Sequence, residues 1–262
     1  MLEIIKTTKN KKYKYIKSLL QKKVRMSEGV FTVEGKKSVE FVLNSDYEIK
    51  TVAMSESFYN DGNMDLPMGI EVVEIDDVLF DGLCDTKTPQ GILAVIKMKD
   101  KESFSIKPDG MYIFCDNVTD PGKLGTIIRT ADAAGIDGVL LSQGCVDLYS
   151  PKTVRASMGS FFNIDIAREF EYEKLFDMKK EGYMLCCGAL EKDSRKYTDI
   201  DFTKPTVIVV GNEANGVCQR ILEECEHIII PIYGKAESLN VGVAAAVIMY
   251  EAVRQRENKW KD

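Results

Sequence analysis

Residues 205–216 read PTVIVVGNEANG, an unbroken apolar run of strand length that ends in a polar segment between two glycines. Such a run is typical of a strand that is buried on both faces of a parallel sheet. Comparable runs occur at Met111–Cys115 and His227–Ile232, and segments of helical character separate them. Alternating strands and helices predict an α/β domain with a mostly parallel sheet, in which ligands bind beyond the carboxyl ends of the strands.

The amino-terminal hundred residues show the same alternation on a smaller scale. A helix is predicted at Lys36–Leu43, and strands are predicted at Val30–Val33, Ile49–Met54, Ile70–Ile75 and Gly91–Met98. Residues 99–108 are polar and end in proline, which is typical of a linker. We therefore expect a small α/β domain at residues 1–98, a linker at 99–108 and a second domain at 109–262.

Composition excludes several classes of protein. With 45% hydrophobic and 29% charged residues, the 262-residue chain has the composition of a folded globular protein. No apolar run approaches the roughly 18 residues of a membrane span, and the apolar start is too short for a secretory signal. The seven cysteines contain no Cys-x-x-Cys pair, and His227 is the single histidine. These features predict a cytoplasmic protein with reduced thiols and no metal site.

Positive charge is concentrated at the amino terminus. The net charge is −6, but residues 1–40 hold eleven Lys or Arg against four Glu, which leaves −13 for the rest. Helical spacing predicts one helix whose buried face is formed by Ile16, Leu19, Leu20 and Val24. The opposite face would carry Lys11, Lys14, Lys22 and Arg25. Such a stripe suits a phosphate backbone, although a solvated helix face explains a charge run equally well.

Three loops that follow predicted strands carry candidate functional residues. In the first, Gly125 and Arg129 are one helical turn apart, so Arg129 can project toward an anion at the strand ends. The second contains Gly211, where backbone can approach a ligand closely, although a tight turn explains the glycine as well. The third contains Ser238, a plausible cap of a helix over Ser238–Arg256, and Asn240, whose amide can donate and accept.

The order and spacing of these loops resemble the SpoU (TrmH) family of RNA ribose 2′-O-methyltransferases. Asp120–Asp132 is similar to the first motif of that family, Gly211–Glu213 to the second, and Ile230–Val241 with Tyr250–Ala252 to the third. The amino-terminal domain resembles the ribosomal-protein-like RNA-binding module of the family at Val33–Gly35 and Thr88–Ile92. The resemblance thus covers nearly the whole chain.

The resemblance implies a fold, a cofactor and an assembly. The carboxyl-terminal sheet would contain a deep trefoil knot that builds an S-adenosylmethionine site largely from backbone groups. In this chain the cofactor residues would be Gly188, Gly211, Asn212, Ile230 and Leu239. Family members are homodimers. Leu239, Val243, Val247 and Tyr250 would form a buried or self-associating helix face, and burial in the core is the default interpretation of that pattern.

The resemblance also implies the catalytic residues, which are Arg129, Glu213, Ser238 and Asn240. Methyl transfer needs aligned reactants and a 2′-hydroxyl that loses its proton. Because arginine stays protonated, we expect Arg129 to stabilise the alkoxide electrostatically, while Ser238 and Asn240 position the ribose, Arg129 or the cofactor. No metal is required.

The chain departs from the family pattern at Lys123, where the family usually has asparagine, and at Ala214 and Gly242, which replace a usual glycine and serine. Lys123 can bind an RNA phosphate. The leading hypothesis is a methyltransferase acting on structured RNA, with 23S-type ribosomal RNA favoured over tRNA and no DNA expected. The alternative is an RNA-binding protein of the same fold with weak or lost activity; an enzyme acting on a small molecule is a third, weaker reading.

Overall fold

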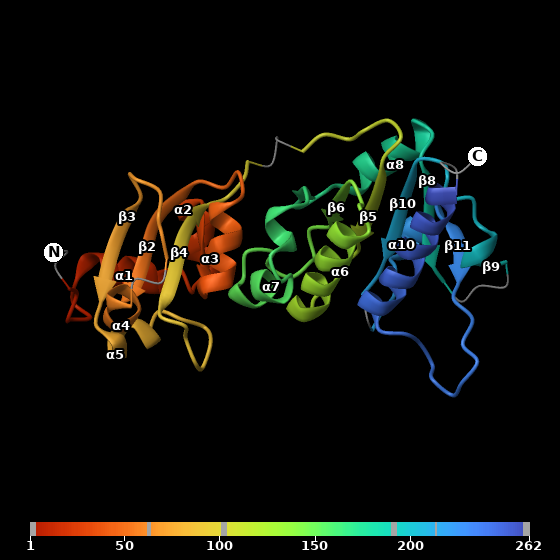
Figure 1. The fold of residues 1–262 in the computed structure, drawn as a ribbon. Coiled ribbons are helices and arrows are strands. Elements are labelled where there is room, and N and C mark those ends of the chain that lie inside the picture. The colour runs from red at the N-terminus through yellow and green to blue at the C-terminus, as the bar shows by residue number, and fades with distance from the viewer. Residues whose placement is uncertain (1–3, 62–63, 101–103, 190–192, 213, 259–262) are drawn as a thin grey trace. The chain divides into compact units, whose positions relative to one another are not determined.

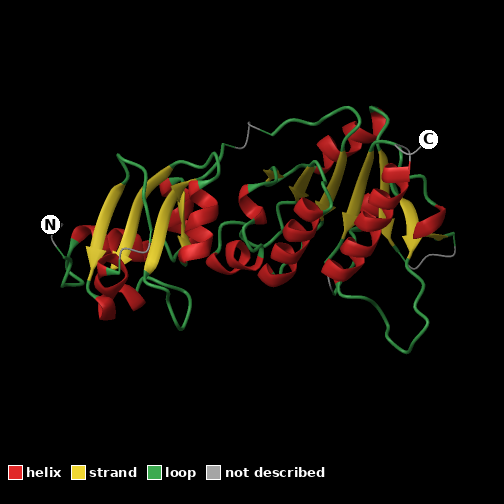
Figure 2. Ribbon diagram, in the orientation of Figure 1, coloured by secondary structure: helices red, strands yellow, loops and turns green. Residues whose placement is uncertain are grey.

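The computed structural model describes residues 4–61, 64–100, 104–189, 193–212 and 214–258. Contacts divide the chain into two compact units, each built on one sheet (Figure 2). The first unit contains residues 1–100 and 149–162, and the second contains residues 101–148 and 163–262.

The first unit has a four-stranded mixed sheet in the order β1-β4-β2-β3. Its strands are β1 (Val30–Glu34), β2 (Ile49–Ser55), β3 (Glu71–Ile75) and β4 (Ile92–Lys97). β4 pairs antiparallel with β1 and β2, and β2 pairs parallel with β3. Its first five helices are α1 (Lys11–Ser18), α2 (Lys22–Glu28), α3 (Lys36–Leu43), α4 (Glu56–Asn60) and α5 (Asp77–Asp81). The four strands and the helix predicted from sequence are confirmed.

The predicted basic helix is instead two helices, and Arg25 joins them. Arg25 in α2 is only 3% exposed. Its Nη1 donates hydrogen bonds to the carbonyl oxygens of Leu19 (2.7 Å) and Leu20 (2.8 Å), just beyond the end of α1. Carbonyls at a helix carboxyl terminus lack partners within the helix and attract a cation. The predictions of one continuous helix and of an exposed Arg25 are therefore wrong, whereas Lys11, Lys14 and Lys22 are exposed as predicted.

Replacing Arg25 by methionine is expected to lower the free energy of unfolding by about 1.5–3 kcal/mol, because a buried and a partly buried carbonyl lose a charged donor. Lys14→Met is the matched control, and its exposed position predicts a change within about 0.5 kcal/mol. Urea unfolding followed by circular dichroism measures both. Equal stability of the two variants would contradict this role of Arg25.

The first unit also contains α7 (Pro151–Ala156) and the 3-10 helix η2 (Ser160–Phe162), which lie within the domain predicted at residues 109–262. Aromatic packing explains their place. The ring centroids of Phe31 in β1 and Tyr149 are 4.6 Å apart, and those of Phe31 and Phe161 are 5.5 Å apart. All three rings are at most 3% exposed. Contacts thus group residues 149–162 with the first unit, and the predicted domain boundaries stay a prediction.

The second unit has a seven-stranded sheet in the order β7-β6-β5-β10-β8-β11-β9, and all of its paired strands are parallel (Figure 1). The strands are β5 (Met111–Cys115), β6 (Gly138–Leu141), β7 (Ile166–Ala167), β8 (Met184–Gly188), β9 (Arg195–Lys196), β10 (Thr206–Val210) and β11 (Glu226–Ile229). The predicted α/β fold with a mostly parallel sheet is confirmed. β10 lies between two strands that precede it in the chain, β5 and β8. The trefoil knot stays a prediction.

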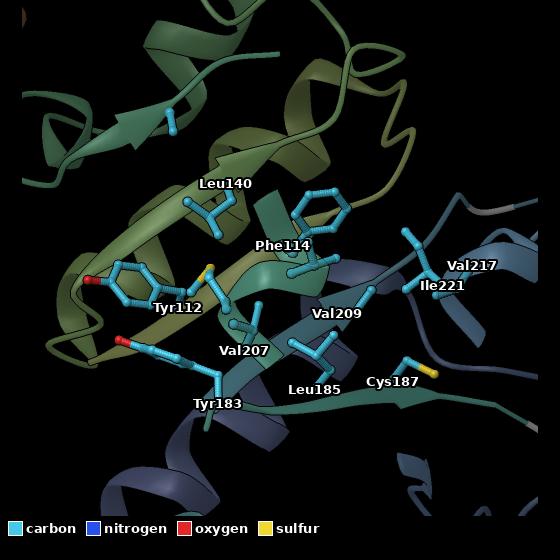
Figure 3. Packing of buried hydrophobic residues seen from close by; sticks show 13 residues of the cluster. Tyr112, Phe114, Leu140, Tyr183, Leu185, Cys187, Val207, Val209, Val217 and Ile221 are labelled. Atoms are coloured by element: carbon cyan, nitrogen blue, oxygen red, sulfur yellow. The ribbon is translucent and has the colours of Figure 1, made fainter. Parts of the chain in front are cut away.

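Helices cover both faces of this sheet. They are α6 (Pro121–Ala133), α8 (Tyr172–Lys180), α9 (Gln219–Leu222), α10 (Val241–Asn258) and the 3-10 helix η3 (Tyr197–Asp199). α6 and α10 pack against each other, α6 also contacts β6, and α10 contacts β10. Side chains of α8 and α9 join a cluster with Phe114, Leu185 and Val209 (Figure 3). Every residue of β10 is buried, as the unbroken apolar run predicts. No helix in the described part of the chain is long and apolar enough to cross a membrane.

Candidate active site at the carboxyl ends of the parallel strands

The predicted cofactor residues follow neighbouring strands of the second unit. Gly188 ends β8, Gly211 follows β10, and Ile230 follows β11. β10 and β11 flank β8, and the pairs run parallel, so these three positions meet at one edge of the sheet. The first motif leaves β5, which is the other neighbour of β10. Parallel pairing thus brings the three motif loops together at the edge where α/β proteins bind ligands.

α6 presents Arg129 to solvent. Asp120 caps this helix by accepting a hydrogen bond from the Lys123 backbone nitrogen (2.8 Å), and Pro121 occupies the first turn. Gly125, Ile127 and Ile128 are buried, whereas Arg129 is exposed. Arg129 forms no hydrogen bond or ion pair with the residues that the structure describes. The exposed guanidinium is a candidate contact for a substrate.

α10 begins at Val241 rather than at Ser238. Asn240 caps the helix: its Oδ1 accepts from the Gly242 backbone nitrogen (2.9 Å), and its carbonyl oxygen accepts from Ala244 (2.9 Å). The proposed cap at Ser238 is therefore wrong, and Ser238 is an exposed loop residue. The Asn240 amide nitrogen has no hydrogen-bond partner among the described residues, so it can donate to a ligand.

Gly242 joins the third motif to the first. A Cβ at this position would lie 3.2 Å from Thr126 Cγ2 on α6 and 3.3 Å from Asn240 Oδ1. Thr126 is one turn from Thr130 and three residues from Arg129 on the same helix. Glycine in place of the usual serine therefore permits a close approach of α10 to α6, and it places Asn240 beside the helix that carries Arg129.

The loop between β10 and α9 requires glycine at its first position. A Cβ at Gly211 would lie 2.3 Å from the carbonyl carbon of Gly216, far inside contact distance. The Asn212 side chain holds this loop, because its Nδ2 donates to the Asn117 carbonyl (2.9 Å) and its Oδ1 accepts from the Ala214 nitrogen (2.9 Å). Its amide is thus engaged within the protein. Glu213, the remaining predicted residue of this motif, lies outside the described residues.

The groups that remain open at this edge suit S-adenosylmethionine. Gly188 is exposed, and a Cβ added there meets no atom within 4 Å, so its backbone is accessible. Leu239 is 37% exposed, and Ile230 is partly exposed. Accessible backbone beside apolar side chains can hydrogen-bond an adenine and cover its ring.

Sequence reasoning missed Asp116, the residue directly after β5. Asp116 is only 1% exposed. Its Oδ1 accepts from the Tyr172 hydroxyl (2.6 Å) and from Asn117 Nδ2 (2.8 Å), and its Oδ2 accepts from the Cys218 backbone nitrogen (2.8 Å). Burial, and after it the hydrogen bond to Asp116, raises the pKa of Tyr172. The phenol therefore keeps its proton and donates a hydrogen bond to Asp116. The signal available in the sequence was a carboxylate placed directly after an apolar strand.

The predicted RNA-binding cations are divided between the two units. Lys11, Lys14 and Lys22 are exposed in the first unit, whereas Arg25 has the structural role described above. Lys123 lies in the second unit, in the first turn of α6, and is partly exposed. That all of these cations bind one RNA stays a prediction.

Comparison with known protein families identifies both parts of the chain. Residues 110–250 match the SpoU rRNA Methylase family, and residues 10–94 match the MRM3-like substrate binding domain. The chain belongs to the SpoU rRNA methylase family. The predicted family and its amino-terminal substrate-binding domain are therefore confirmed.

Relatives of this SpoU methylase extend over the whole chain. It is 36% identical to the 23S rRNA (guanosine(2553)-2′-O)-methyltransferase RlmP of Bacillus subtilis, over 94% of this chain and 97% of the relative. It is 28% identical to the 23S rRNA (uridine(2479)-2′-O)-methyltransferase of Streptomyces viridochromogenes, over 95% and 92%. The crystal structure of an AdoMet-bound rRNA methyltransferase from Sinorhizobium meliloti superposes with a TM-score of 0.85 at 32% identity, covering 97% of this chain and 98% of that one. The predicted reaction and cofactor are confirmed.

Proposed function

We propose that this protein transfers a methyl group from S-adenosylmethionine to a ribose 2′-hydroxyl of 23S-type ribosomal RNA, and that Arg129 is the central catalytic residue. The observations that carry the proposal are the convergence of the three motif loops at one edge of the parallel sheet and an exposed arginine on α6, the helix of the first motif, that no described residue neutralises. Two relatives that match the chain over more than nine-tenths of its length are named for 23S rRNA, which supports that substrate over tRNA.

Bound S-adenosylmethionine supplies an electrophilic methyl group on a sulfonium. The chain must therefore align the 2′-oxygen and favour loss of its proton. A guanidinium stays protonated in proteins, so Arg129 acts as a fixed positive charge that donates hydrogen bonds to the oxygen as negative charge develops on it. The guanidinium is exposed and no described residue binds it, which supports a role toward the substrate.

Asn240 and Ser238 complete the site as positioning residues. Asn240 Oδ1 caps α10, and this hydrogen bond fixes the side chain at the start of the helix. The amide nitrogen of the same side chain has no partner among the described residues, so it can donate to a ligand. The close approach of α10 to α6 at Gly242 places that donor beside α6, because even a Cβ at this position would lie 3.2 Å from Thr126 Cγ2. Ser238 lies two residues before Asn240, in the exposed loop before α10, and its hydroxyl can contact the ribose or the cofactor.

The first unit is the RNA-holding module in this proposal. Lys11, Lys14 and Lys22 are exposed along α1 and the start of α2. Exposed lysines bind phosphates by Coulomb attraction and counterion release, without reading sequence.

Replacing all three lysines by alanine is expected to weaken binding of a ribosomal RNA fragment and to reduce the slope of log K against log salt by roughly 2 to 3. Filter binding at several salt concentrations measures both quantities. The control variant replaces Lys174, Lys179 and Lys180 of α8 in the other unit, and it should keep the wild-type slope. If the triple variant in the first unit keeps the wild-type affinity and slope, these lysines form only a solvated helix face and do not bind RNA.

We propose further that the protein acts in the cytoplasm as a homodimer that uses the exposed side of α10. Val243 is 49% exposed and Tyr250 is 50% exposed, so interpreting these two residues as core is wrong. Both lie on the helix that follows the third motif, and an apolar surface there is suited to a second copy. Sedimentation equilibrium of wild type and Val243→Glu tests the proposal: a dimer that the variant splits supports it, and a monomeric wild type contradicts it.

Substrate choice is tested by methylation in vitro. Unmodified ribosomal RNA and unmodified tRNA are incubated with the enzyme and labelled S-adenosylmethionine, separately and in competition. The expected result is label in ribosomal RNA and none in tRNA. Preferential labelling of tRNA would overturn the preference without affecting the reaction type.

A further inference from the structure

The Asp116 carboxylate joins three segments that are far apart in the chain. It lies at the end of β5, and it binds the hydroxyl of Tyr172 in the first turn of α8 and the backbone of Cys218 directly before α9. The next residue, Asn117, accepts a hydrogen bond from Asn212 at the start of the β10–α9 loop. The pair Asp116–Asn117 therefore holds this loop at both ends, at Asn212 and at Cys218.

A buried carboxylate is unfavourable unless donors surround it. Asp116 has three, and the short bond from Tyr172 is charge-assisted. The Tyr172 hydroxyl fixes Oδ1, which leaves Oδ2 directed at the Cys218 nitrogen. The position of the β10–α9 loop relative to the loop after β5 thus depends on a phenol that is in neither loop.

We propose that Asp116 and Tyr172 are positioning residues that set the affinity for S-adenosylmethionine by clamping the loop 211–218 against the end of β5. The inference rests on the proposed function, since the cofactor is held by that loop. Because Asp116 is only 1% exposed, the pair would act through the loop and not on the reacting atoms. Its loss should therefore raise the KM for the cofactor and leave kcat at saturating cofactor nearly unchanged.

Tyr172→Phe removes the hydroxyl and keeps the ring, whose centroid lies 6.0 Å from that of Phe114. We expect the dissociation constant for S-adenosylmethionine, measured by calorimetry, to rise roughly tenfold, because a charge-assisted hydrogen bond is lost. Asp116→Asn should have a larger effect, since an amide has a single acceptor oxygen and cannot accept from both sides. Hydrogen exchange at the backbone amide of Cys218 should be faster in both variants, with or without cofactor.

Tyr183→Phe is the matched control. Tyr183 precedes β8 at the opposite edge of the sheet, is 4% exposed, and donates its hydroxyl proton to the Lys107 carbonyl. The control should lose comparable stability and keep the wild-type cofactor affinity. An unchanged cofactor affinity in Tyr172→Phe would overturn the clamp. An equal loss of cofactor affinity in Tyr183→Phe would overturn it as well. Failure of the wild type to bind cofactor would contradict the proposed function instead, and in that case Cys218 exchange still decides whether Tyr172 holds the loop.

Discussion

Replacing Arg129 by alanine is expected to lower kcat for methyl transfer by roughly 10²- to 10³-fold, which is the effect of removing a donor that stabilises developing negative charge. The dissociation constant for S-adenosylmethionine should change by less than about twofold, because Arg129 is assigned to the ribose oxygen (a change of that size corresponds to under about 0.4 kcal/mol). Single-turnover methylation of ribosomal RNA and calorimetry measure the two effects separately.

Two controls sharpen this prediction. The melting temperature of Arg129→Ala should stay within about 2 °C of wild type, because the side chain is exposed and binds no described residue. Arg129→Lys keeps the charge and loses the planar fork of donors, so it should recover part of the lost rate. Unchanged turnover in Arg129→Ala would remove the residue from the mechanism.

Gly211→Ala should be the most damaging change in the cofactor loop. Its Cβ would lie 2.3–2.4 Å from three backbone atoms of Gly216 and Val217, and backbone atoms can make room only if the loop moves. Overpacking of this kind costs about 1–3 kcal/mol of stability. Because the displaced loop is the one assigned to the cofactor, we also expect the affinity for S-adenosylmethionine to fall by more than about tenfold.

Gly188→Ala separates steric damage from loss of the cofactor contact. Its Cβ would meet no atom within 4 Å, so the free energy of unfolding should change by less than about 1 kcal/mol. If the backbone of Gly188 faces the cofactor as proposed, the added methyl group should still weaken cofactor binding. Wild-type affinity in Gly188→Ala would remove this residue from the site, and wild-type affinity in Gly211→Ala would remove the loop.

The parallel sheet could be predicted from sequence because strands that are buried on both faces appear as unbroken apolar runs. β5 and β10 are apolar at nearly every position, and every residue in both strands is buried. The meeting of the motif loops then follows from topology alone, since parallel strands have their carboxyl ends at one edge. The catalytic roles depended on resemblance, because an exposed arginine on a helix has no distinctive pattern of its own.

Other features could not be read from the sequence because they depend on contacts between distant residues. Helical periodicity places Arg25 on the polar face of a single helix, and only the fold shows its guanidinium on the carbonyls of Leu19 and Leu20. The cap of α10 is Asn240 and not Ser238, because the helix begins at Val241. Asp116 looked like an ordinary loop residue, since its partner Tyr172 is 56 positions away.

The central claim is methyl transfer to a ribose 2′-hydroxyl with Arg129 as the catalytic residue. The most direct test uses tritium-labelled S-adenosylmethionine and unmodified ribosomal RNA with the wild type and Arg129→Ala, followed by complete alkaline hydrolysis. The account predicts label in an alkali-stable dinucleotide with the wild type and almost none with the variant, because a methylated 2′-oxygen cannot attack the neighbouring phosphate. Label released entirely in mononucleotides would place the methyl group on a base and contradict the account.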